Sequence, residues 1–422
     1  MAILALQHVL AMYAGAVAVP LIVGSALGLS AADQAFLVSA DLFTCGIATL
    51  LQTVGVGRHL GVRLPVLLGV SFTSVGPMIS IGRQLGLPYV YGAILVAGVF
   101  MVLVSGQFGR LRRLFPPVVT GSVVTVIGTT LAPVALGWAA GGVGAADFGA
   151  PRHLLLALLV LLVIAGVFHF GERRGHSFLA SIAVLLGLAV GALVAALLGW
   201  ISFAEVARAP WLAITTPLRF GWPALNLWAV LSMLLVAMLC MIESMGVFMA
   251  LSKVVGVPLA EQDVARGLRA EGVAVVLGGL LNSFPYTTFS QNAGLVALSR
   301  VKSRYVVAVA GALLMGLGLL PKFAALLAAL PKAVLGGAGV VMFGMVAASG
   351  IRVLGEVDFG RAQNLFIVAV ALGLGLGVST TPQALGQLPP ALRLLCSDGI
   401  VVGSLAAITL NAALNRTEQP GA

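Results

Sequence analysis

The chain has 422 residues, of which 60% are hydrophobic and only 9% are charged. Soluble domains carry roughly 25% charged residues, so this composition excludes an ordinary soluble protein and indicates an integral membrane protein. The net charge is +10, but the basic residues are spread between apolar runs, which argues against binding to nucleic acid. Cys45, Cys240 and Cys396 show no CxxC spacing, and we expect them to be reduced and buried.

Apolar runs bounded by charges or by Gly and Pro clusters predict an all-α fold with fourteen membrane spans. The first apolar run lacks a basic n-region, so we expect no cleavable signal peptide. The predicted limits in chain order are 3–25, 34–55, 64–82, 88–107, 115–138, 153–170, 178–200, 223–251, 264–282, 284–299, 304–328, 333–354, 362–379 and 397–414.

The basic residues give these spans an orientation. If the N-terminus is cytoplasmic, seven of the 23 basic residues fall outside and the other sixteen (23 − 7) fall inside. The outer seven are Arg83, Arg152, Arg208, Arg219, Lys322, Lys332 and Arg393. This asymmetry follows the positive-inside rule. An even span count then places both termini in the cytoplasm, and we expect the protein in the cell (inner) membrane.

Fourteen spans divide into two halves of seven, and an odd number per half inverts the second half relative to the first, as in many secondary transporters. The third span of each half should then be unusual in the same way. Span 3 is short and is interrupted by Gly69, Gly76 and Pro77. Span 10 has only 15 residues, 285–299, before a basic run that starts at Arg300.

Fifteen helical residues rise ~22 Å, which is less than the ~30 Å thickness of the hydrocarbon core. The segment 282–294 is also rich in hydroxyl and amide side chains, so it has to line a cavity inside protein rather than face lipid. We therefore expect both spans to be broken, with a short β-strand (66–71 and 286–289) followed by a half-helix. The two helix N-termini would point at a midplane cavity.

Glu243 stands out among the acidic residues, most of which we assign to loops, because it lies in the apolar segment 234–250. An ionised carboxylate at that depth costs at least ~2.5–3.5 kcal/mol. Glu243 should therefore face a cavity, find hydrogen-bond donors or take up a proton. Glu271, at the start of span 9, has two open interpretations: a pair with Arg269 or an ordinary loop charge.

Polar and aromatic residues near the broken spans complete the candidate site. Gln291 and Asn292 each offer a donor and an acceptor that suit a flat heterocycle. Phe72 and Phe289 could stack on such a ring, although aromatics usually serve packing. His8 is either a hydrogen-bonded packing residue or part of the site. The sequence contains no metal-ligand cluster, P-loop or nucleophile–base pair, so we expect neither an enzyme nor an ATP-driven pump, and no cofactor.

The segment 291–300 (QNAGLVALSR) resembles the signature of the nucleobase–ascorbate transporter family. That signature has Gln or Glu, then Asn, any residue, Gly, four residues, a hydroxyl residue and a basic residue. Segments 7–8, 69–72, 242–246 and 269–272 resemble the family as well, and the bacterial xanthine and uric acid permeases are its most similar members. The resemblance implies proton-coupled import of a purine nucleobase by an elevator-type motion.

The family's architecture carries over as an expectation. A core domain would consist of spans 1–4 and 8–11 (residues 1–107 and 223–330). A gate domain would consist of spans 5–7 and 12–14 (residues 108–222 and 331–422), and a homodimer would form through the gate domains. The coupling ion would be a proton, and the other partners would be the purine nucleobase and the lipid bilayer.

The resemblance also implies roles for single residues. Glu243 and Gln291 would hydrogen-bond the base, Phe72 would stack near it, and backbone around Phe289 and Ser290 would complete the contact. Asn292 and Glu271 would support proton coupling, and His8 would tune affinity.

Gln291 favours a purine such as xanthine or uric acid, because uracil carriers of the family tend to have Glu there. Several relatives carry a polar residue one turn after the binding Glu, where this chain has Val247, so the proton relay departs from the family pattern. Two alternatives remain: a uracil–proton symporter, and an anion transporter of the same fold, in which helix dipoles would bind the anion.

Overall fold

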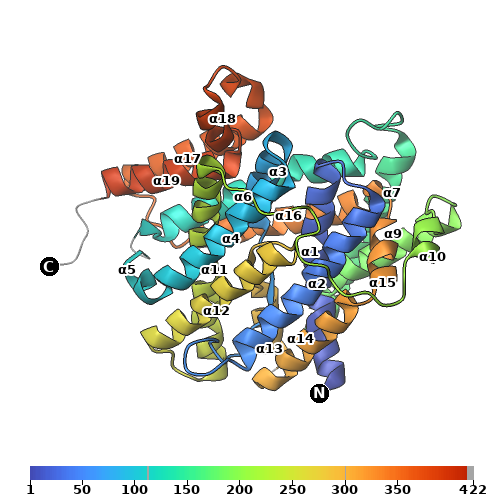
Figure 1. Ribbon diagram of the computed structural model, residues 1–422, viewed down its shortest axis with the longest axis horizontal. Helices are drawn as coiled ribbons and strands as arrows, with labels where there is room; N and C mark the ends of the chain where they lie inside the picture. Colours follow the sequence, from blue (N-terminus) through green and yellow to red (C-terminus); the bar gives the residue numbers. More distant parts are fainter. Residues whose placement is uncertain (112–113, 300, 416–422) are drawn as a thin grey trace.

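The computed structural model describes residues 1–111, 114–299 and 301–415. Within that part the chain forms helices joined by loops and one pair of three-residue strands (Figure 1); the longest loops are 54–67 and 209–226. Four basic residues used for the predicted orientation lie outside it: Arg112, Arg113, Arg300 and Arg416.

The first half of the chain holds one strand and most of the short helices. Its elements are α1 (Ala2–Ala26), α2 (Ala31–Thr53), β1 (Leu68–Val70), the 3-10 helix η1 (Phe72–Ser74), α3 (Val75–Gln84), α4 (Leu87–Val104), the 3-10 helix η2 (Ser105–Gln107), α5 (Phe108–Leu111), α6 (Pro117–Ala139), α7 (Pro151–Arg173), α8 (Ser177–Ser181), α9 (Ala183–Leu197) and α10 (Ala204–Arg208).

The second half starts with the longest helix and holds the other strand. Its elements are α11 (Leu227–Val255), α12 (Glu261–Leu280), β2 (Tyr286–Thr288), α13 (Ser290–Ser299), α14 (Arg304–Gly318), α15 (Pro321–Ala328), α16 (Lys332–Leu354), α17 (Ala362–Thr380), the 3-10 helix η4 (Pro382–Leu385), α18 (Pro390–Cys396) and α19 (Gly399–Leu414).

Several helix ends follow from local sequence. Ser30 and Asn226 cap α2 and α11, because their side chains accept hydrogen bonds from backbone N–H groups of the first turn. Helix α11 ends at Gly256, which takes up the left-handed conformation (φ 81°) that glycine adopts without strain.

Eight described helices are long and apolar enough to cross a membrane, or nine if α14 and α15, which are bent by 78°, count as one span. The eight are α1, α2, α4 with η2, α6, α7, α11, α16 and α17, and each coincides with a predicted span. The other six predicted spans fall on shorter, bent or more polar segments: α3, α9, α12, α13, α14 with α15, and α19. A mostly helical, multi-pass membrane protein is therefore confirmed.

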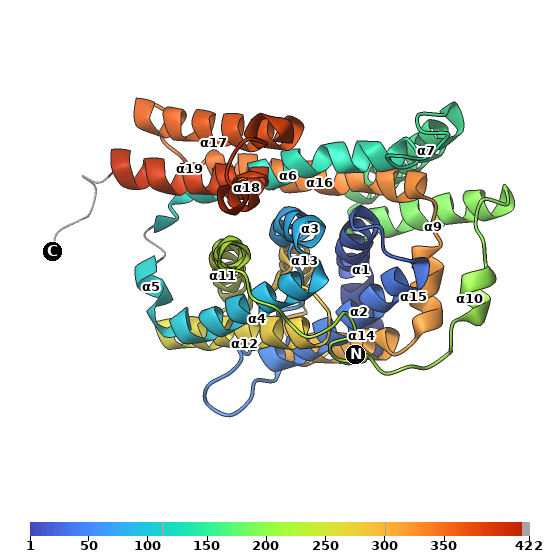
Figure 2. The same cartoon turned by 45° about the horizontal axis from the view of Figure 1, so that its top comes forward.

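The helices lie in two layers that are clearest in Figure 2. One layer contains α6, α7, α9, α16, α17 and α19, and α6 packs along α16. The other contains α1 to α4 and α11 to α15, where α2 packs on α14 and α4 on α12. Each layer therefore combines segments from both halves of the chain.

Glycines allow the helices to approach closely. A Cβ atom at Gly46 of α2 would lie only 2.4 Å from the carbonyl oxygen of Gly311 in α14. A Cβ atom at Gly128 of α6 would lie 2.2 Å from the backbone nitrogen of Ala347 in α16. Small residues at such crossings are typical of helix packing in membranes, where van der Waals contact replaces the hydrophobic effect as the main attraction.

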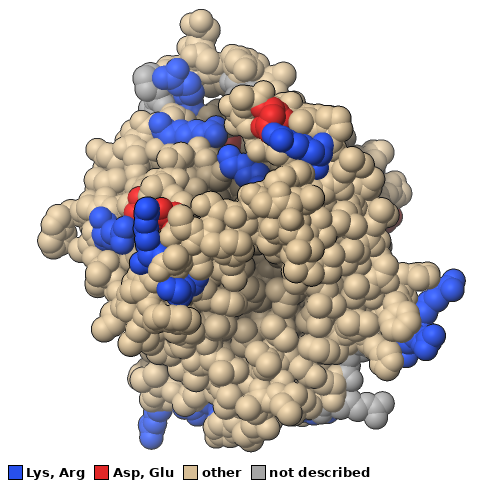
Figure 3. Space-filling model, turned by 90° about the vertical axis from the view of Figure 1, so that its right-hand side faces the viewer, with Lys and Arg blue, Asp and Glu red and all other residues tan. Residues whose placement is uncertain are grey.

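The molecular surface fits a protein surrounded by lipid. Figure 3 shows a face on which Lys and Arg gather at a few places, some beside Asp or Glu, with wide uncharged areas between them. Leu103, Leu155 and Leu197 are 65–78% exposed on their helices. Exposed apolar side chains on this scale would be unfavourable in water and are favourable in a bilayer.

Candidate functional site

The two strands form an antiparallel pair in the layer that contains α1 to α4 and α11 to α15, where β1 contacts α1 and α2 and β2 contacts α11 and α12. Leu68, Gly69 and Val70 face Thr288, Thr287 and Tyr286, respectively. Further backbone hydrogen bonds extend the pairing on both sides, from the Ser71 N–H to the Pro285 carbonyl (2.9 Å) and from the Phe289 N–H to the Leu67 carbonyl (3.0 Å). Both extended pieces predicted from the sequence are present, and each precedes a ten-residue helix, α3 or α13.

Glu243 lies on α11 beside this strand pair, half-buried. The Thr73 hydroxyl donates to its Oε1 (3.3 Å), and the Thr287 hydroxyl donates to its Oε2 (3.4 Å). Thr73 follows β1 and Thr287 lies in β2, so the carboxylate contacts both strand-and-helix segments. The expectation that Glu243 finds hydrogen-bond donors is confirmed. Both bonds are long, which leaves the oxygens able to accept stronger N–H donors.

Ser244, the next residue of α11, is fully buried and completes the outer edge of β2. Its Oγ accepts a hydrogen bond from the Thr288 N–H (2.8 Å) and lies 3.2 Å from the Thr287 Oγ1. A helix side chain thus satisfies a backbone group that a third strand would bond in a larger sheet. This contact fixes the strand against α11 next to Glu243.

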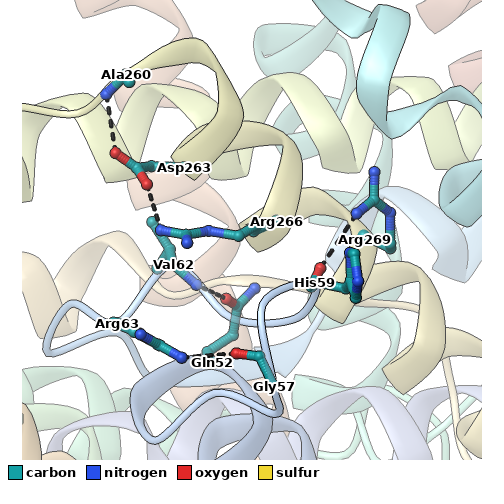
Figure 4. A network of polar contacts seen from close by, with 9 residues as sticks. All are labelled: Gln52, Gly57, His59, Val62, Arg63, Ala260, Asp263, Arg266 and Arg269. Carbon is teal, nitrogen blue, oxygen red and sulfur yellow. Dashed lines mark hydrogen bonds and ion pairs between the residues drawn. The ribbon is translucent and has the colours of Figure 1, made fainter.

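Glu271 is completely buried in α12, so its interpretation as a loop charge is wrong. The pair with Arg269 is also wrong, because Arg269 donates to the His59 carbonyl (3.2 Å), as Figure 4 shows. Residues two apart on a helix point to nearly opposite sides, which prevents the pair. Neither carboxylate oxygen of Glu271 has a hydrogen-bond partner among the described residues, and its polar neighbours are Ser244 and Glu243.

His8 and Asn292 connect α1 to α13. The His8 Nδ1 lies 2.6 Å from the Asn292 Oδ1, and both side chains are at least 98% buried. With the amide oxygen as acceptor, Nδ1 carries the proton. The Asn292 Nδ2 has no partner among the described residues. The two residues thus form one buried unit at the start of α13, directly after the candidate binding residue Gln291.

Gln291 and Ser290, at the first turn of α13, are exposed and contact each other, with the Ser290 hydroxyl 3.4 Å from the Gln291 Oε1. Phe72 is partly buried and packs edge-to-face on Phe343 of α16, with ring centroids 5.7 Å apart. Phe72 therefore lies where the two helix layers meet.

Phe289 is 7% exposed, and its ring fills the space between α1 and β1. A Cβ atom at Gly69 would lie 2.1 Å from the ring, and one at Gly15 would lie 2.9 Å from it. The backbone N–H of Phe289 is bonded to Leu67. The ring therefore packs the site, whereas Phe72 is the more accessible of the two aromatics.

We expect Gly69→Ala to displace Phe289 and to lower the thermal unfolding temperature by several degrees, because overpacking a tight site costs about 1–3 kcal/mol. Thermal unfolding of the purified protein in detergent measures this effect. Gly316→Ala is the matched control, since no atom of the described residues lies within 4 Å of a Cβ atom there. Adding Phe289→Leu to Gly69→Ala should recover part of the loss; unfolding at the wild-type temperature in Gly69→Ala alone would contradict the packing.

Four polar residues of this region were not found from the sequence: Thr73, Thr287, Ser244 and Asp41. Asp41 is completely buried in the middle of α2, so the assignment of acidic residues to loops does not hold for it. The three cysteines are free; Cys45 and Cys240 are buried as expected, whereas Cys396 is only partly buried, which corrects the expectation for that residue. No group of three or more His, Cys, Asp or Glu side chains in residues 1–111, 114–299 and 301–415 is arranged to hold a metal ion.

Comparison with known proteins assigns the family. Residues 1–384 match the profile of a family described as the permease family. The chain is 50% identical to the uric acid permease PucK of Bacillus subtilis (strain 168), over 99% of this chain and 96% of that protein. It is 48% identical to a xanthine permease of the same organism, over 98% of this chain and 93% of that protein.

A solved structure shows the same fold at low identity. The transmembrane domain of the cyanobacterial bicarbonate transporter BicA matches with a TM-score of 0.62 and 14% identity, covering 97% of this chain and 96% of that chain. Such a match concerns the fold alone. The matches in sequence show that the chain is a transporter and not an enzyme, and that it belongs to the permease family of the xanthine and uric acid permeases, as its motifs indicate.

Proposed function

We propose that this protein imports purine nucleobases, xanthine and uric acid in particular, together with protons. The observation that carries the proposal is the Glu243 carboxylate, held by Thr73 and Thr287 where the two strand-and-helix segments meet. The names of the two Bacillus relatives, a uric acid permease and a xanthine permease, support the substrate class.

The chemistry of the site fits a flat, polar heterocycle. Glu243 accepts N–H groups from one edge of the base. The Gln291 carboxamide presents both a donor and an acceptor, which matches the mixed edge of an oxidised purine. Phe72 stacks on the ring, and the backbone near Phe289 and Ser290 closes the contact.

Proton coupling follows from the same carboxylate. Glu243 takes up a proton on the outer side and keeps it in the loaded state, where its carbonyl oxygen accepts an N–H group of the base. Proton and base are released together inside, and the empty site returns deprotonated, without any further cofactor. Glu271, Asn292 and His8 support the coupling from behind α13 and β2. Val247 lies one turn after Glu243 on α11 and is half-buried. Its side chain cannot relay a proton, so the hydroxyls of Thr73 and Thr287 relay it instead.

We also propose that transport uses an elevator-type motion of a core domain against a gate domain. Fourteen spans form a 7+7 inverted repeat in which spans 3 and 10 are broken, supported by β1 with α3 and β2 with α13 as matching units of equal helix length. The layer with α1–α4 and α11–α15 is the core domain, and the layer with α6, α7, α9, α16, α17 and α19 is the gate domain. The gate domains pair in a homodimer in the inner membrane, with both termini in the cytoplasm.

Two other functions fit less well. A uracil symporter would be expected to carry Glu at position 291, where this chain has Gln. An anion transporter shares the fold, as the bicarbonate transporter BicA illustrates. However, an inorganic anion has no N–H group to donate to the Glu243 carboxylate, which would only repel it.

Uptake of radiolabelled xanthine and uric acid in cells that lack purine permeases tests the proposal. Expected results are uptake that rises with external acidity and competition by unlabelled xanthine or uric acid. Uptake that does not depend on pH, or that neither purine competes with, would refute it. Competition by uracil alone, or sulfate or chloride flux into liposomes, would favour one of the alternatives.

Asp147→Asn provides a control for the pH dependence. Asp147 lies in the loop between α6 and α7, where the Arg152 guanidinium and the His153 ring lower its pKa from the ordinary value to about 2. Because this pKa is lowered, the interaction is present at neutral pH and is lost only as the pH falls towards 2. The variant should therefore show the wild-type pH profile of uptake, and a changed profile would place the titrating group outside the proposed site.

A further inference from the structure

Helix α2 carries four polar residues on one face: Asp41, Cys45, Thr49 and Gln52, spaced by four, four and three residues. All four are fully buried. This polar face of α2 lies against the two strands and the start of α12. None of these four side chains is among those proposed to contact the substrate.

The three residues towards the end of α2 hold neighbouring backbone. The Cys45 thiol donates to the Leu68 carbonyl of β1, and the Thr49 Oγ1 accepts from the Leu68 N–H (3.2 Å). The Gln52 Nε2 donates to the Gly267 carbonyl of α12 (2.7 Å). Its Oε1 accepts from the Val62 N–H (3.1 Å), as Figure 4 shows. The face thus anchors β1 and the loop that leads into it.

Asp41 makes the corresponding contact with β2. Its Oδ1 accepts hydrogen bonds from the Ser283 hydroxyl (2.9 Å) and from the Tyr286 hydroxyl (3.1 Å). The two hydroxyl oxygens are 2.6 Å apart, so the three side chains close a triangle. The Asp41 Oδ2 has no partner among the described residues, and no ion pair in that part of the chain involves Asp41.

The alternation of side chains along β2 connects the contacts of Asp41 with the candidate site. Successive side chains of a strand point to opposite faces, so Tyr286 and Thr287 point in opposite directions from β2. Tyr286 contacts Asp41 of α2, and Thr287 contacts Glu243 of α11. The strand is therefore held between two carboxylates that come from helices on its two sides.

A carboxylate without a cationic partner is expensive to bury in a membrane protein, so such residues usually serve a function. An apolar side chain at position 41 would leave the hydroxyls of Ser283 and Tyr286 without their carboxylate acceptor. We propose that Asp41 is a positioning residue of the substrate site: through Tyr286 and Ser283 it fixes β2 where Thr287 reaches Glu243. The effect on transport rests on the proposed function, whereas the effect on β2 does not.

Two substitutions of Asp41 distinguish the loss of its acceptor oxygen from other effects of changing the side chain. Asp41→Leu removes the acceptor and keeps the branched shape and the number of side-chain heavy atoms, and Asp41→Asn keeps an acceptor oxygen for Ser283 and Tyr286. Thr44→Val is the matched control, because the buried Thr44 hydroxyl donates to the Ala40 carbonyl of its own helix and contacts neither strand. Tyr286→Phe removes one of the two donors to Asp41.

Hydrogen exchange of the purified protein gives a readout that does not require transport. Asp41→Leu should accelerate amide exchange in the peptide that covers residues 283–292 about tenfold, because Ser283 and Tyr286 lose their side-chain acceptor. Only the backbone carbonyl of residue 41, 3.2 Å from the Tyr286 hydroxyl, stays in place. Asp41→Asn and Thr44→Val should stay near the wild-type rate. An unchanged rate in Asp41→Leu, or equal acceleration in Asp41→Asn, would overturn the proposal.

Transport kinetics test the link to the site. Asp41→Leu should raise the KM for xanthine about tenfold, with Asp41→Asn within threefold of the wild type. Tyr286→Phe should add little to the effect of Asp41→Leu, because both act through the same contact. Fully additive effects would contradict the shared contact. If wild-type protein transports no purine while exchange in Asp41→Leu is accelerated, the proposed function fails and the anchoring of β2 stands.

Discussion

Replacing Glu243 by Gln is expected to abolish proton-coupled purine uptake. A carboxamide cannot take up and release a proton, and it offers one acceptor oxygen where the carboxylate offers two. Loss of a hydrogen bond to a charged group costs about 1.5–3 kcal/mol, or about 10- to 150-fold in affinity. Uptake of labelled xanthine across a range of external pH measures both losses in one experiment.

Matched variants separate this effect from general damage. Glu172→Gln makes the same chemical change on an exposed residue of α7 and should transport like the wild type. Thr287→Val removes one long hydrogen bond to Glu243 and should raise the KM only about two- to tenfold. Wild-type pH-dependent uptake by Glu243→Gln, at equal protein in the membrane, would remove Glu243 from its assigned role.

Replacing Gln291 by Glu is expected to reduce the preference of the protein for purines over uracil. The change removes the N–H donor of the carboxamide, so an acceptor on the purine edge is left without a partner. An unpaired buried polar group costs about 1–3 kcal/mol, which corresponds to a KM for xanthine about 5- to 150-fold higher. The ratio of uracil to xanthine uptake should rise at the same time.

A competition panel of xanthine, uric acid, guanine, hypoxanthine and uracil measures this change. Gln262→Glu, an exposed residue on α12, is the control for added negative charge and should keep the wild-type order of competitors. If Gln291→Glu also keeps that order, the side chain at position 291 does not select the base.

Sequence patterns were sufficient for the parts of the fold that depend on local composition. Long apolar runs located the membrane helices, and the Gly and Pro interruptions located β1 before α3. The undersized polar segment located β2 before α13. Glu243 was singled out as a candidate site residue because a carboxylate in an apolar helix is costly. Each of these signals lies within about twenty residues of sequence.

The contacts that define the site are not local, and the sequence did not reveal them. Asp41 meets Ser283 across 242 positions of the chain, and His8 meets Asn292 across 284. Thr73 and Thr287 become partners of Glu243 only because β1 pairs with β2 beside α11. The register of two three-residue strands follows from packing on α2 and α11, which composition does not encode.

The error over Glu271 has a simpler cause. Arg269 and Glu271 are neighbours in sequence, but α12 is already helical at both positions. Arg269 therefore turns towards the loop that contains His59, while Glu271 turns into the protein interior. Helical periodicity, applied to these two positions of the sequence, is sufficient to exclude the ion pair.

Proton movement into proteoliposomes tests the central claim most directly. With a pH-sensitive dye trapped in the lumen, addition of xanthine outside should acidify the lumen of vesicles that contain the wild-type protein. Vesicles with the Glu243→Gln variant should show no acidification, and the Glu172→Gln variant should behave like the wild type. Entry of labelled xanthine without acidification, or equal acidification by the Glu243→Gln variant, would contradict proton-coupled purine transport through this carboxylate.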